Sequence, residues 1–557
     1  MRPARLLLPI LIVLLPLLPP ETRGESMAGA AVLIALLALL VRSADRDASR
    51  ALLLAIAVSA AAVVFLYPAS ASVPLAAAVL AGAAGIHVAA LPRAVRWSPF
   101  VPASLAAAAA LVSLHALSQK LWGLRSLAER VLAMPGIPDR EAILARLGEG
   151  RAFAAFPTPA ALGGFLALAL PVTVALALEA RQRARIALLG AAALELAGLL
   201  CSASATAAAA LLGALALAAL SRNISRRALV AGGICVLLVI VAIAAMRGSE
   251  VLDPDHPGSP WSLRAGNFRA AWAMAVDHPW TGVAPGGFGG ALPAYLRPGD
   301  NETRYAHDLP LQLAAETGFP AAAFLSMLFL ALFLRPVFSR CGEGAPRWLA
   351  GARVGLAAFA LHNLADFTAF LPSMLWLAAL LRGAASEAAD EKRAGEPSPG
   401  DDLRRGLLAG ALAAAAVTAL AGFGWNARIE ARERLAMGAF DQAVASARRA
   451  AALAPWDSEA EIARAQALLA RGSAARRDAG DLREALEAAD RAVSLDPLRP
   501  GARDTRARTR AALGDLPGAY ADFSEAARLY PLRADYSRRR DEIAAALPGR
   551  AARKGAP

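Results

Sequence analysis

The chain has 557 residues, of which 57% are hydrophobic, and its mean hydropathy is +0.46. This is more apolar than a soluble core requires, so the composition excludes an ordinary soluble enzyme and indicates a polytopic membrane protein. A net charge of +13 would favour nucleic-acid binding in a soluble chain, but here the arginines fall largely between apolar runs, where they fix orientation. We therefore expect no nucleic-acid partner.

Apolar runs long enough to cross about 30 Å of hydrocarbon predict an all-helical transmembrane bundle of about 12 to 13 spans. The first run, residues 1–26, is either an N-terminal anchor or a signal peptide, because Arg2 and Arg5 precede a short Leu-rich core, and Met27 is an alternative start. The candidate spans begin near residues 5, 27, 51, 73, 98, 159, 185, 203, 228, 310, 349, 367 and 405.

The linkers between these runs predict an orientation, because linkers rich in arginine alternate with linkers that carry few basic residues. One arrangement fits them all: the basic linkers are cytoplasmic, and the two long loops, 119–158 and 247–309, lie outside. In a bacterium this places the membrane domain, residues 27–383, in the inner membrane with both loops facing the periplasm.

The three cysteines lie in or beside apolar segments and show no paired spacing, so neither a disulfide framework nor a zinc site is supported. They are Cys201, Cys235 and Cys341.

The chain changes character towards its C-terminus. Residues 384–404 read as a polar cytoplasmic linker and 405–423 as the last span, whereas 424–557 is rich in Ala, Arg, Leu and Glu. Two pairs of residues recur 34 positions apart, namely Gly480 with Gly514 and Pro497 with Pro531. This is the tetratricopeptide period, so we expect about three such repeats in a periplasmic α-solenoid that binds a protein partner or self-associates. A plain helical bundle is the alternative.

The longest polar interruption of the later membrane region runs from Arg264 to Pro320 and holds the motifs HPWTGVAPGGFG and AHDLPLQLAAETGFP. Upstream lies GRAFAAFPTPAALGGFLALALP from Gly150, and downstream LHNLADFTAFLP from Leu361. In this order the motifs resemble the O-antigen ligase and polymerase superfamily over roughly residues 27–383. Two departures stand out: the chain has His307-Asp308 where the family usually has His-Asn, and CSASAT from Cys201 where the family has a small Ser-Arg-Gly motif.

The resemblance implies a glycosyltransferase that needs neither metal nor cofactor and inverts the sugar. It would move a glycan from a polyprenyl-pyrophosphate carrier to an acceptor at the periplasmic face. The first expectation is O-antigen ligation to the lipid A core, with repeat-unit polymerisation and protein O-glycan ligation as alternatives. A non-catalytic scaffold for envelope glycan assembly is the alternative from another class.

The candidate site residues follow from the charge of a pyrophosphate leaving group, which a planar guanidinium binds while staying charged. Arg264 is the leading candidate, and Arg151 from the other long loop would converge on the same phosphates. Arg269 would lie on a different helix face. Each is otherwise a solvated or snorkelling side chain. His307 would accept the acceptor's proton or hydrogen-bond a phosphate; the alternative is an interfacial or capping histidine.

Four further residues complete the predicted site. Asp308 would orient His307 or cap the following helix. Glu316 is either a buried polar partner or an ordinary interfacial residue. His362 and Asp366, four residues apart, would share one helix face and flank the same cavity, because a carboxylate and an imidazole at membrane depth are costly without partners.

Two other patterns have simpler explanations. The glycines of 286–290 would cradle phosphate through their backbone amides, or form a flexible turn. Asp253, Asp255 and His256 resemble a metal motif, but prolines at 254 and 257 indicate a rigid turn, and we expect no metal.

Overall fold

The computed structural model describes residues 97–133, 140–221, 224–248, 260–339, 344–385, 420, 423–474 and 478–547. Within these ranges the regular structure is helical and contains no strand, which confirms the predicted all-α class there. Several predictions lie outside the described residues, namely the anchor at 1–26, the spans expected near 27, 51 and 73, the Asp253–His256 pattern, Cys341, and most of residues 384–423.

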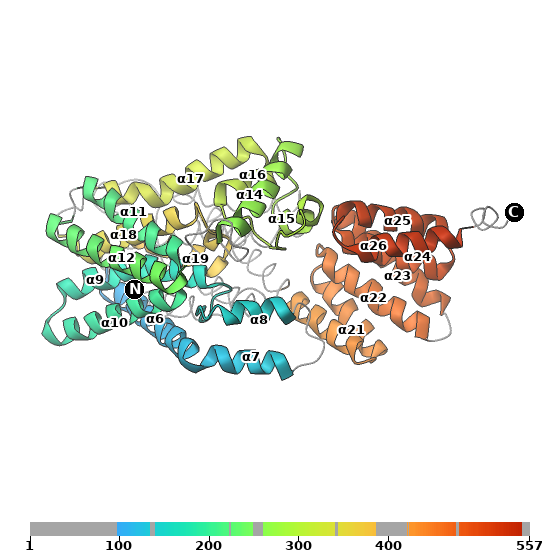
Figure 1. Cartoon of the computed structure of the whole chain (residues 1–557), viewed down its shortest axis with the longest axis horizontal. Helices are drawn as coiled ribbons and strands as arrows, with labels where there is room; N and C mark the ends of the chain where they lie inside the picture. The colour runs from blue at the N-terminus through green and yellow to red at the C-terminus, as the bar shows by residue number, and fades with distance from the viewer. Residues whose placement is uncertain are drawn as a thin grey trace, which may run out of the picture.

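Apolar helices form a bundle, drawn from blue to yellow in Figure 1. Among the residues described, five helical stretches are long and apolar enough to cross a membrane: Phe100–Ala133 (α6, η2 and α7 together), α9 (Pro159–Glu179), α10 (Gln182–Ser202), α12 (Arg226–Arg247) and α17 (Phe319–Phe338). Three shorter apolar helices pack among them: α11 (Ala205–Ser221), α18 (Trp348–His362) and α19 (Pro372–Ala384). The molecule is therefore built as a multi-pass membrane protein.

One predicted span starts later than expected. The apolar run from about residue 310 is divided into α16 (Leu309–Thr317) and α17 by Gly318, which has a φ of +77°. A Cβ at Gly318 would lie 2.5 Å from the carbonyl carbon of Trp280, so a side chain does not fit at the break. The helix that is long and apolar enough to cross a membrane therefore begins at Phe319.

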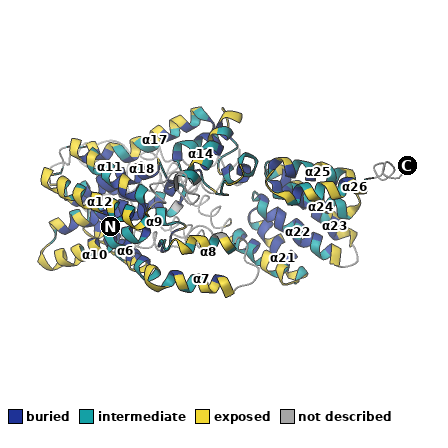
Figure 2. Cartoon of the chain, viewed as in Figure 1, coloured by how far each residue is buried: buried dark blue, intermediate teal, exposed yellow. Residues whose placement is uncertain are grey.

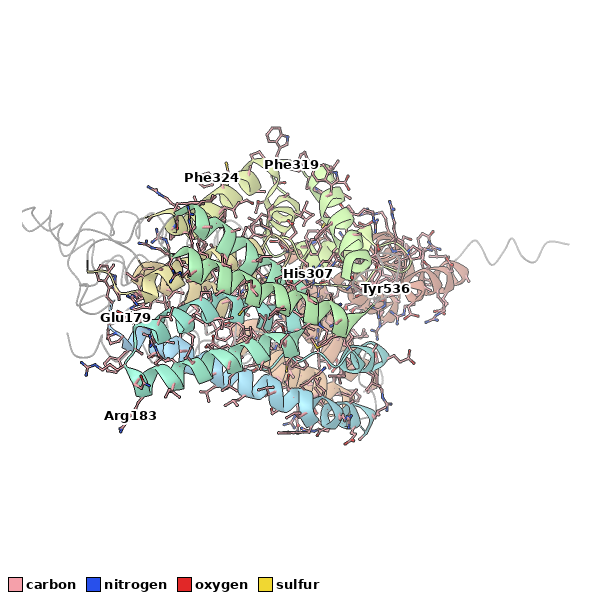
Figure 3. The ribbon with its side chains drawn as sticks, turned by 60° about the vertical axis from the view of Figure 1, so that its left-hand side comes forward. Glu179, Arg183, His307, Phe319, Phe324 and Tyr536 are labelled. Atoms are coloured by element: carbon pink, nitrogen blue, oxygen red, sulfur yellow. The ribbon has the colours of Figure 1, made fainter. Side chains whose placement is uncertain are left out.

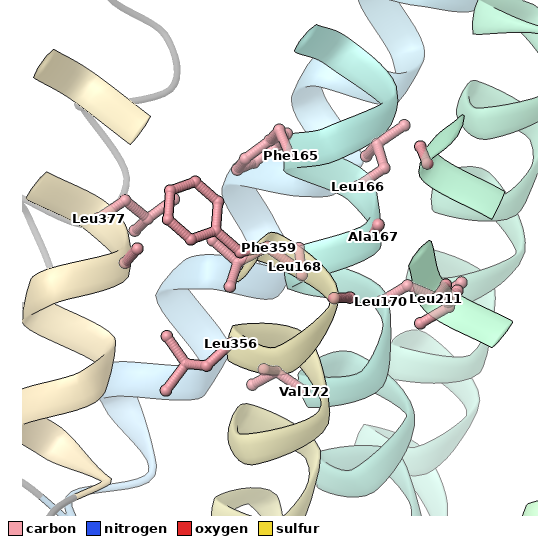
Figure 4. Close-up of a cluster of buried hydrophobic side chains, with 14 of the residues drawn as sticks. Phe165, Leu166, Ala167, Leu168, Leu170, Val172, Leu211, Leu356, Phe359 and Leu377 are labelled. Carbon is pink, nitrogen blue, oxygen red and sulfur yellow. The ribbon is translucent and has the colours of Figure 1, made fainter. Parts of the chain in front are cut away.

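The centre of the bundle is the contact between α9 and α18. Gly351 and Gly355 lie one turn apart on α18, and a Cβ at either would collide with the backbone carbonyls of Pro171 and Leu168 on α9. Small residues spaced in this way let two helix backbones approach closely in a membrane. Large side chains fill the space beside this contact, including Phe359 of α18 (Figure 4). The close contact fixes the register of α18, and with it the position of His362 at the end of α18.

A proline explains one of the contacts between α17 and α19. Pro336 lies inside α17 and has no N–H to donate, so the carbonyl of Leu332, four residues earlier, lacks its helical partner. The Nε of Arg382 on α19 donates to that carbonyl at 2.9 Å. The basic side chain thereby satisfies a backbone group that the proline leaves open.

The segment from 260 to 318 folds against one end of the bundle. It contains α14 (Pro260–Asp277), α15 (Phe288–Ala291), the 3-10 helix η3 (Leu292–Tyr295) and α16. Its small core is formed around Met274, Phe288 and Ala315.

The C-terminal module, residues 423–547, consists of helices that pack in chain order, each against the next (Figure 1, orange to red). After a helical stretch through residues 423–436 they are α21 (Phe440–Leu453), α22 (Ser458–Ala474), α23 (Ala479–Leu495), α24 (Pro500–Leu513), α25 (Leu516–Leu529) and α26 (Ala534–Ala546). Their buried faces line the inside of the module (Figure 2). Helix pairs in series are what the 34-residue period predicts, and the tetratricopeptide assignment stays a prediction.

The C-terminal module contacts the 260–318 segment through the turn between α23 and α24. Leu498 in this turn packs on the core of the segment. A Cβ at the buried Gly290 would lie 3.3 Å from Oδ2 of Asp496 and 3.6 Å from Nη1 of Arg499. The absence of a side chain at Gly290 therefore makes room for this turn.

Candidate functional site

Four parts of the chain meet where the 260–318 segment covers the bundle. They are the 149–158 loop before α9, the first half of α14, the 303–308 loop before α16, and the 363–371 turn after α18. The backbone of Leu309 joins two of them, because its N–H donates to the carbonyl of Asn363 at 2.9 Å. This hydrogen bond brings together residues that are more than fifty positions apart.

Asp366 lies between an arginine and a histidine. Its Oδ2 is 3.9 Å from Nη2 of Arg264 and 3.7 Å from Nε2 of His362, and both Asp366 and His362 are fully buried. The other oxygen, Oδ1, accepts a 2.7 Å hydrogen bond from the N–H of Phe367. Helix α18 ends at His362, so the predicted pairing of His362 with Asp366 is present but arises from the turn after the helix.

The position of His362 depends on a glycine of α9. A Cβ at Gly164 would lie 2.5 Å from the Cδ2 atom of His362. The imidazole thus occupies the space that a side chain at Gly164 would fill.

His307 has an unusual backbone and a packed ring. Its φ is +62°, in the left-handed region, and its ring meets Phe367 edge-on with centroids 4.8 Å apart. Tyr305 stacks on the same phenylalanine at 4.5 Å. The Nδ1 atom of His307 is buried and has no hydrogen-bond partner among the described residues. The backbone strain and the two aromatic contacts hold the imidazole in one orientation. Strained backbone of this kind is common at functional sites.

Electrostatics keeps His307 neutral near pH 7. Burial lowers the pKa of its imidazole from 6.5, Asp366 acts in the opposite direction, and Arg264 lowers it again. Burial also lowers the pKa of the Arg264 guanidinium, while Asp366 raises it. Asp366 is thus the acid that acts on both side chains.

Arg151 lies against the CSASAT turn. Its Nε donates to the carbonyl of Ser202 at 3.1 Å, and the N–H of Ala152 donates to the carbonyl of Cys201 at 2.9 Å. Burial and the neighbouring Arg247 lower the pKa of Arg151 to about 10, with Glu149 opposing them. A guanidinium therefore reaches this turn from a different segment of the chain.

The sequence-based reasoning missed Arg247, the last residue of α12. It lowers the pKa of both Arg151 and Arg264, so it adds a third positive charge to the same place. Its Nε is buried without a hydrogen-bond partner among the residues described. Its position, at the end of a span and the start of a long loop, is the signal that the sequence offers.

Gln119 was also missed. Its side-chain oxygen accepts from the N–H groups of Phe153 at 3.1 Å and Ala154 at 2.7 Å, which holds the loop that carries Arg151. Gln119 starts the π-helix η2 (Gln119–Gly123), a helix type that often marks functional sites. No sequence pattern indicates such a local widening of a helix.

Two of the predicted site residues have other partners. Arg269 forms an ion pair with Asp300. Asp308 caps α16, since its Oδ1 accepts from the N–H of Leu311 at 2.8 Å, which is the capping role that was one of its two expected roles.

Glu316 is buried beneath the glycine-rich turn and holds it. Its Oε1 accepts from the N–H of Phe288 at 3.3 Å and from Nε2 of Gln312 at 2.7 Å. Burial raises its pKa to about 7, and its hydrogen bonds, including one from Gly286, oppose that rise. The N–H groups of Gly287 and Gly290 donate to the carbonyls of Ala284 and Gly287. These amides are engaged inside the protein, which favours the turn over the phosphate cradle.

The structure therefore brings together five of the predicted residues around a positively charged, largely buried place: Arg151, Arg264, His307, His362 and Asp366. Figure 3 shows His307 near the middle of the molecule in that view. In the part of the chain that the structure describes, no three His, Cys, Asp or Glu side chains group as ligands for one metal ion.

Residues 190–326 match the family model described as O-antigen ligase. The match includes Arg264 and His307 but ends before His362 and Asp366, and it begins after Arg151. It supports the superfamily resemblance within that stretch. No curated protein matches the chain.

Proposed function

We propose that the chain is a membrane glycosyltransferase that moves a glycan from a polyprenyl-pyrophosphate carrier to an acceptor at the periplasmic face, and that it ligates O-antigen to the lipid A core. The observation that carries this proposal is the meeting of Arg264, Asp366 and His307 at the end of a membrane bundle. The match to the O-antigen ligase family supports the reaction class.

The arginines would serve the leaving group. As the bond between the anomeric carbon and the phosphate oxygen breaks, the carrier pyrophosphate takes the electron pair and gains negative charge. Arg264 and Arg151 would bind the phosphate oxygens, and fixed positive charges in a dry site stabilise such charge more strongly than water does. Arg151 would also supply the guanidinium that the CSASAT turn lacks.

His307 would serve the acceptor. Its neutral imidazole takes the proton of the acceptor hydroxyl while the hydroxyl oxygen bonds to the anomeric carbon. The new bond forms opposite the one that breaks, so the sugar inverts in a single displacement. Asp366 would position Arg264 and stabilise the imidazolium that forms at His307, and His362 would hold Asp366 in place.

The glycan profile of a deletion strain tests the proposal, with wild type and Arg264→Ala as the complementing genes. Ligation predicts long polymer on the lipid carrier beside bare lipid A core, restored by wild type and not by the variant. Core that carries one repeat would instead indicate a polymerase, and missing glycoprotein glycans a protein O-glycan ligase.

A scaffold is the remaining alternative, and it makes the opposite prediction. If the protein only organises an assembly, Arg264→Ala and His307→Ala keep full function while removal of the C-terminal module abolishes it. On the enzyme proposal the module, as tetratricopeptide repeats, would recruit a protein partner of the pathway to the acceptor side.

A further inference from the structure

From Ala270 to Val276, helix α14 is apolar on both of its faces. Ala270, Ala271 and Met274 pack into the core of the 260–318 segment. On the opposite face Trp272 is 56% exposed and Val276 52% exposed. A helix that borders water carries polar residues on its outer face, whereas a helix that is hydrophobic all round is covered by protein or by lipid.

The exposed side of α14 continues into the membrane helix α17. The ring of Trp272 meets that of Phe319, the first residue of α17, with centroids 5.4 Å apart, and the N–H of Phe319 donates to the carbonyl of Pro279. Trp280 beside this junction is 78% exposed. Phe324 and Met327 extend the surface along α17, each 63% exposed. We call these six residues the α14–α17 apolar face: Trp272, Val276, Trp280, Phe319, Phe324 and Met327.

We propose that the α14–α17 apolar face is covered by bilayer lipid, with Trp272 and Trp280 at the level where acyl chains meet head groups. Half of this face belongs to a helix long and apolar enough to cross the membrane, and the two tryptophans prolong its exposed side past its first residue. Indole rings prefer this boundary because their body is apolar and their N–H is polar. Figure 3 shows Phe319 and Phe324 towards one edge of the molecule.

The charged groups near this face do not oppose the proposal. Arg269, at the edge of the exposed side of α14, forms an ion pair with Asp300. Asp277, at the end of α14, accepts a 2.9 Å hydrogen bond from the hydroxyl of Tyr295. Both charged side chains therefore have a polar partner within the 260–318 segment.

The anchoring has a consequence that rests on the proposed function. Arg264 precedes Trp272 by eight residues on the same helix, which is about 12 Å along the axis. A tryptophan held at the lipid boundary would therefore keep Arg264 within reach of the phosphates of a carrier lipid.

Tryptophan quenching by brominated lipids tests the anchoring independently of any glycan transfer. The full chain would be placed in proteoliposomes whose lipids carry bromine near the head-group end of the acyl chains. The Trp272→Phe/Trp280→Phe variant is compared with wild type, and Trp456→Phe, between α21 and α22 in the C-terminal module, is the matched control. The chain has nine tryptophans, so we expect the emission lost to quenching, measured against the total emission of wild type, to fall by about two ninths in the double variant and not in the control.

Equal quenching in wild type and the double variant would overturn the proposal. So would disulfide-linked dimers of a Trp280→Cys chain in native membranes that the parent chain does not form, since a second copy would then cover the face. Loss of quenching with unchanged glycan transfer would keep the anchoring and remove only its consequence for Arg264. A glycan defect in Arg264→Ala, together with equal quenching in wild type and the double variant, would keep the proposed function and overturn the anchoring.

Discussion

The carboxylate of Asp366 lies 3.9 Å from the guanidinium of Arg264, and the two come from segments that are about a hundred residues apart in the chain. Asp366 is fully buried, and its second oxygen is occupied by a backbone N–H. We therefore expect Asp366 to position Arg264.

Replacing Asp366 by Asn tests this role. The amide keeps the shape but loses the charge, so Arg264 is no longer held, and a shift of about 1 Å costs on the order of a hundredfold in rate. We expect transfer in purified membranes to fall by about that factor while carrier-lipid binding persists. Unchanged transfer would show that Asp366 does not position the arginine.

The pH dependence of transfer follows from the pKa of His307. Burial lowers this pKa below 6.5, so the neutral form predominates at pH 7 and is lost only when the pH falls through the lowered value. We expect a rate that is flat near neutrality and declines in acid. Because Asp366 raises the pKa of His307, Asp366→Asn should move the decline to still lower pH; a shift to higher pH would contradict the assignment.

His307→Asn separates chemistry from folding. Asn tolerates the left-handed backbone that His307 adopts, whereas a β-branched residue does not. We expect His307→Asn to keep the unfolding temperature near that of wild type and to lose about 10²- to 10⁴-fold in transfer, the usual contribution of a general base. His307→Val should lose both. Full transfer by the Asn variant would rule out a proton-accepting role.

The helix contact between α9 and α18 predicts a stability effect. Gly355→Ala places a methyl group against the carbonyl of Leu168, and overpacking of this kind costs about 1–3 kcal/mol. Gly233→Ala on α12, where a Cβ meets nothing within 4 Å, is the matched control. Thermal unfolding in detergent should show a lower melting temperature for Gly355→Ala alone. Equal values for both variants would mean that the two helices do not approach this closely.

Gly290→Leu tests the contact between the C-terminal module and the 260–318 segment. The added side chain meets Asp496 and Arg499, so we expect the 496–499 turn to become more accessible to protease. Gly501→Leu is the control, because a Cβ at Gly501 meets nothing within 4 Å. Identical digestion of both variants would indicate that the module is not seated there.

The candidate site was predictable where a motif places a charged residue beside an apolar run, as at Arg264, His307 and Asp366. The roles of several glycines could not be predicted from the sequence. Gly318 divides a predicted span and Gly351 admits a neighbouring helix, and both effects depend on backbone from distant parts of the chain. Arg247 was missed for the same reason, because only the fold brings it to Arg151 and Arg264. The tetratricopeptide assignment and the membrane orientation remain predictions.

The packing of Leu498 against the core of the 260–318 segment limits how the C-terminal module can be exchanged. A chimera that takes its module from another chain and its membrane bundle from this one would lose this contact and uncover apolar surface of that core. Truncation before the module would uncover the same surface. Loss of activity in such proteins would therefore report a damaged surface as readily as a missing partner.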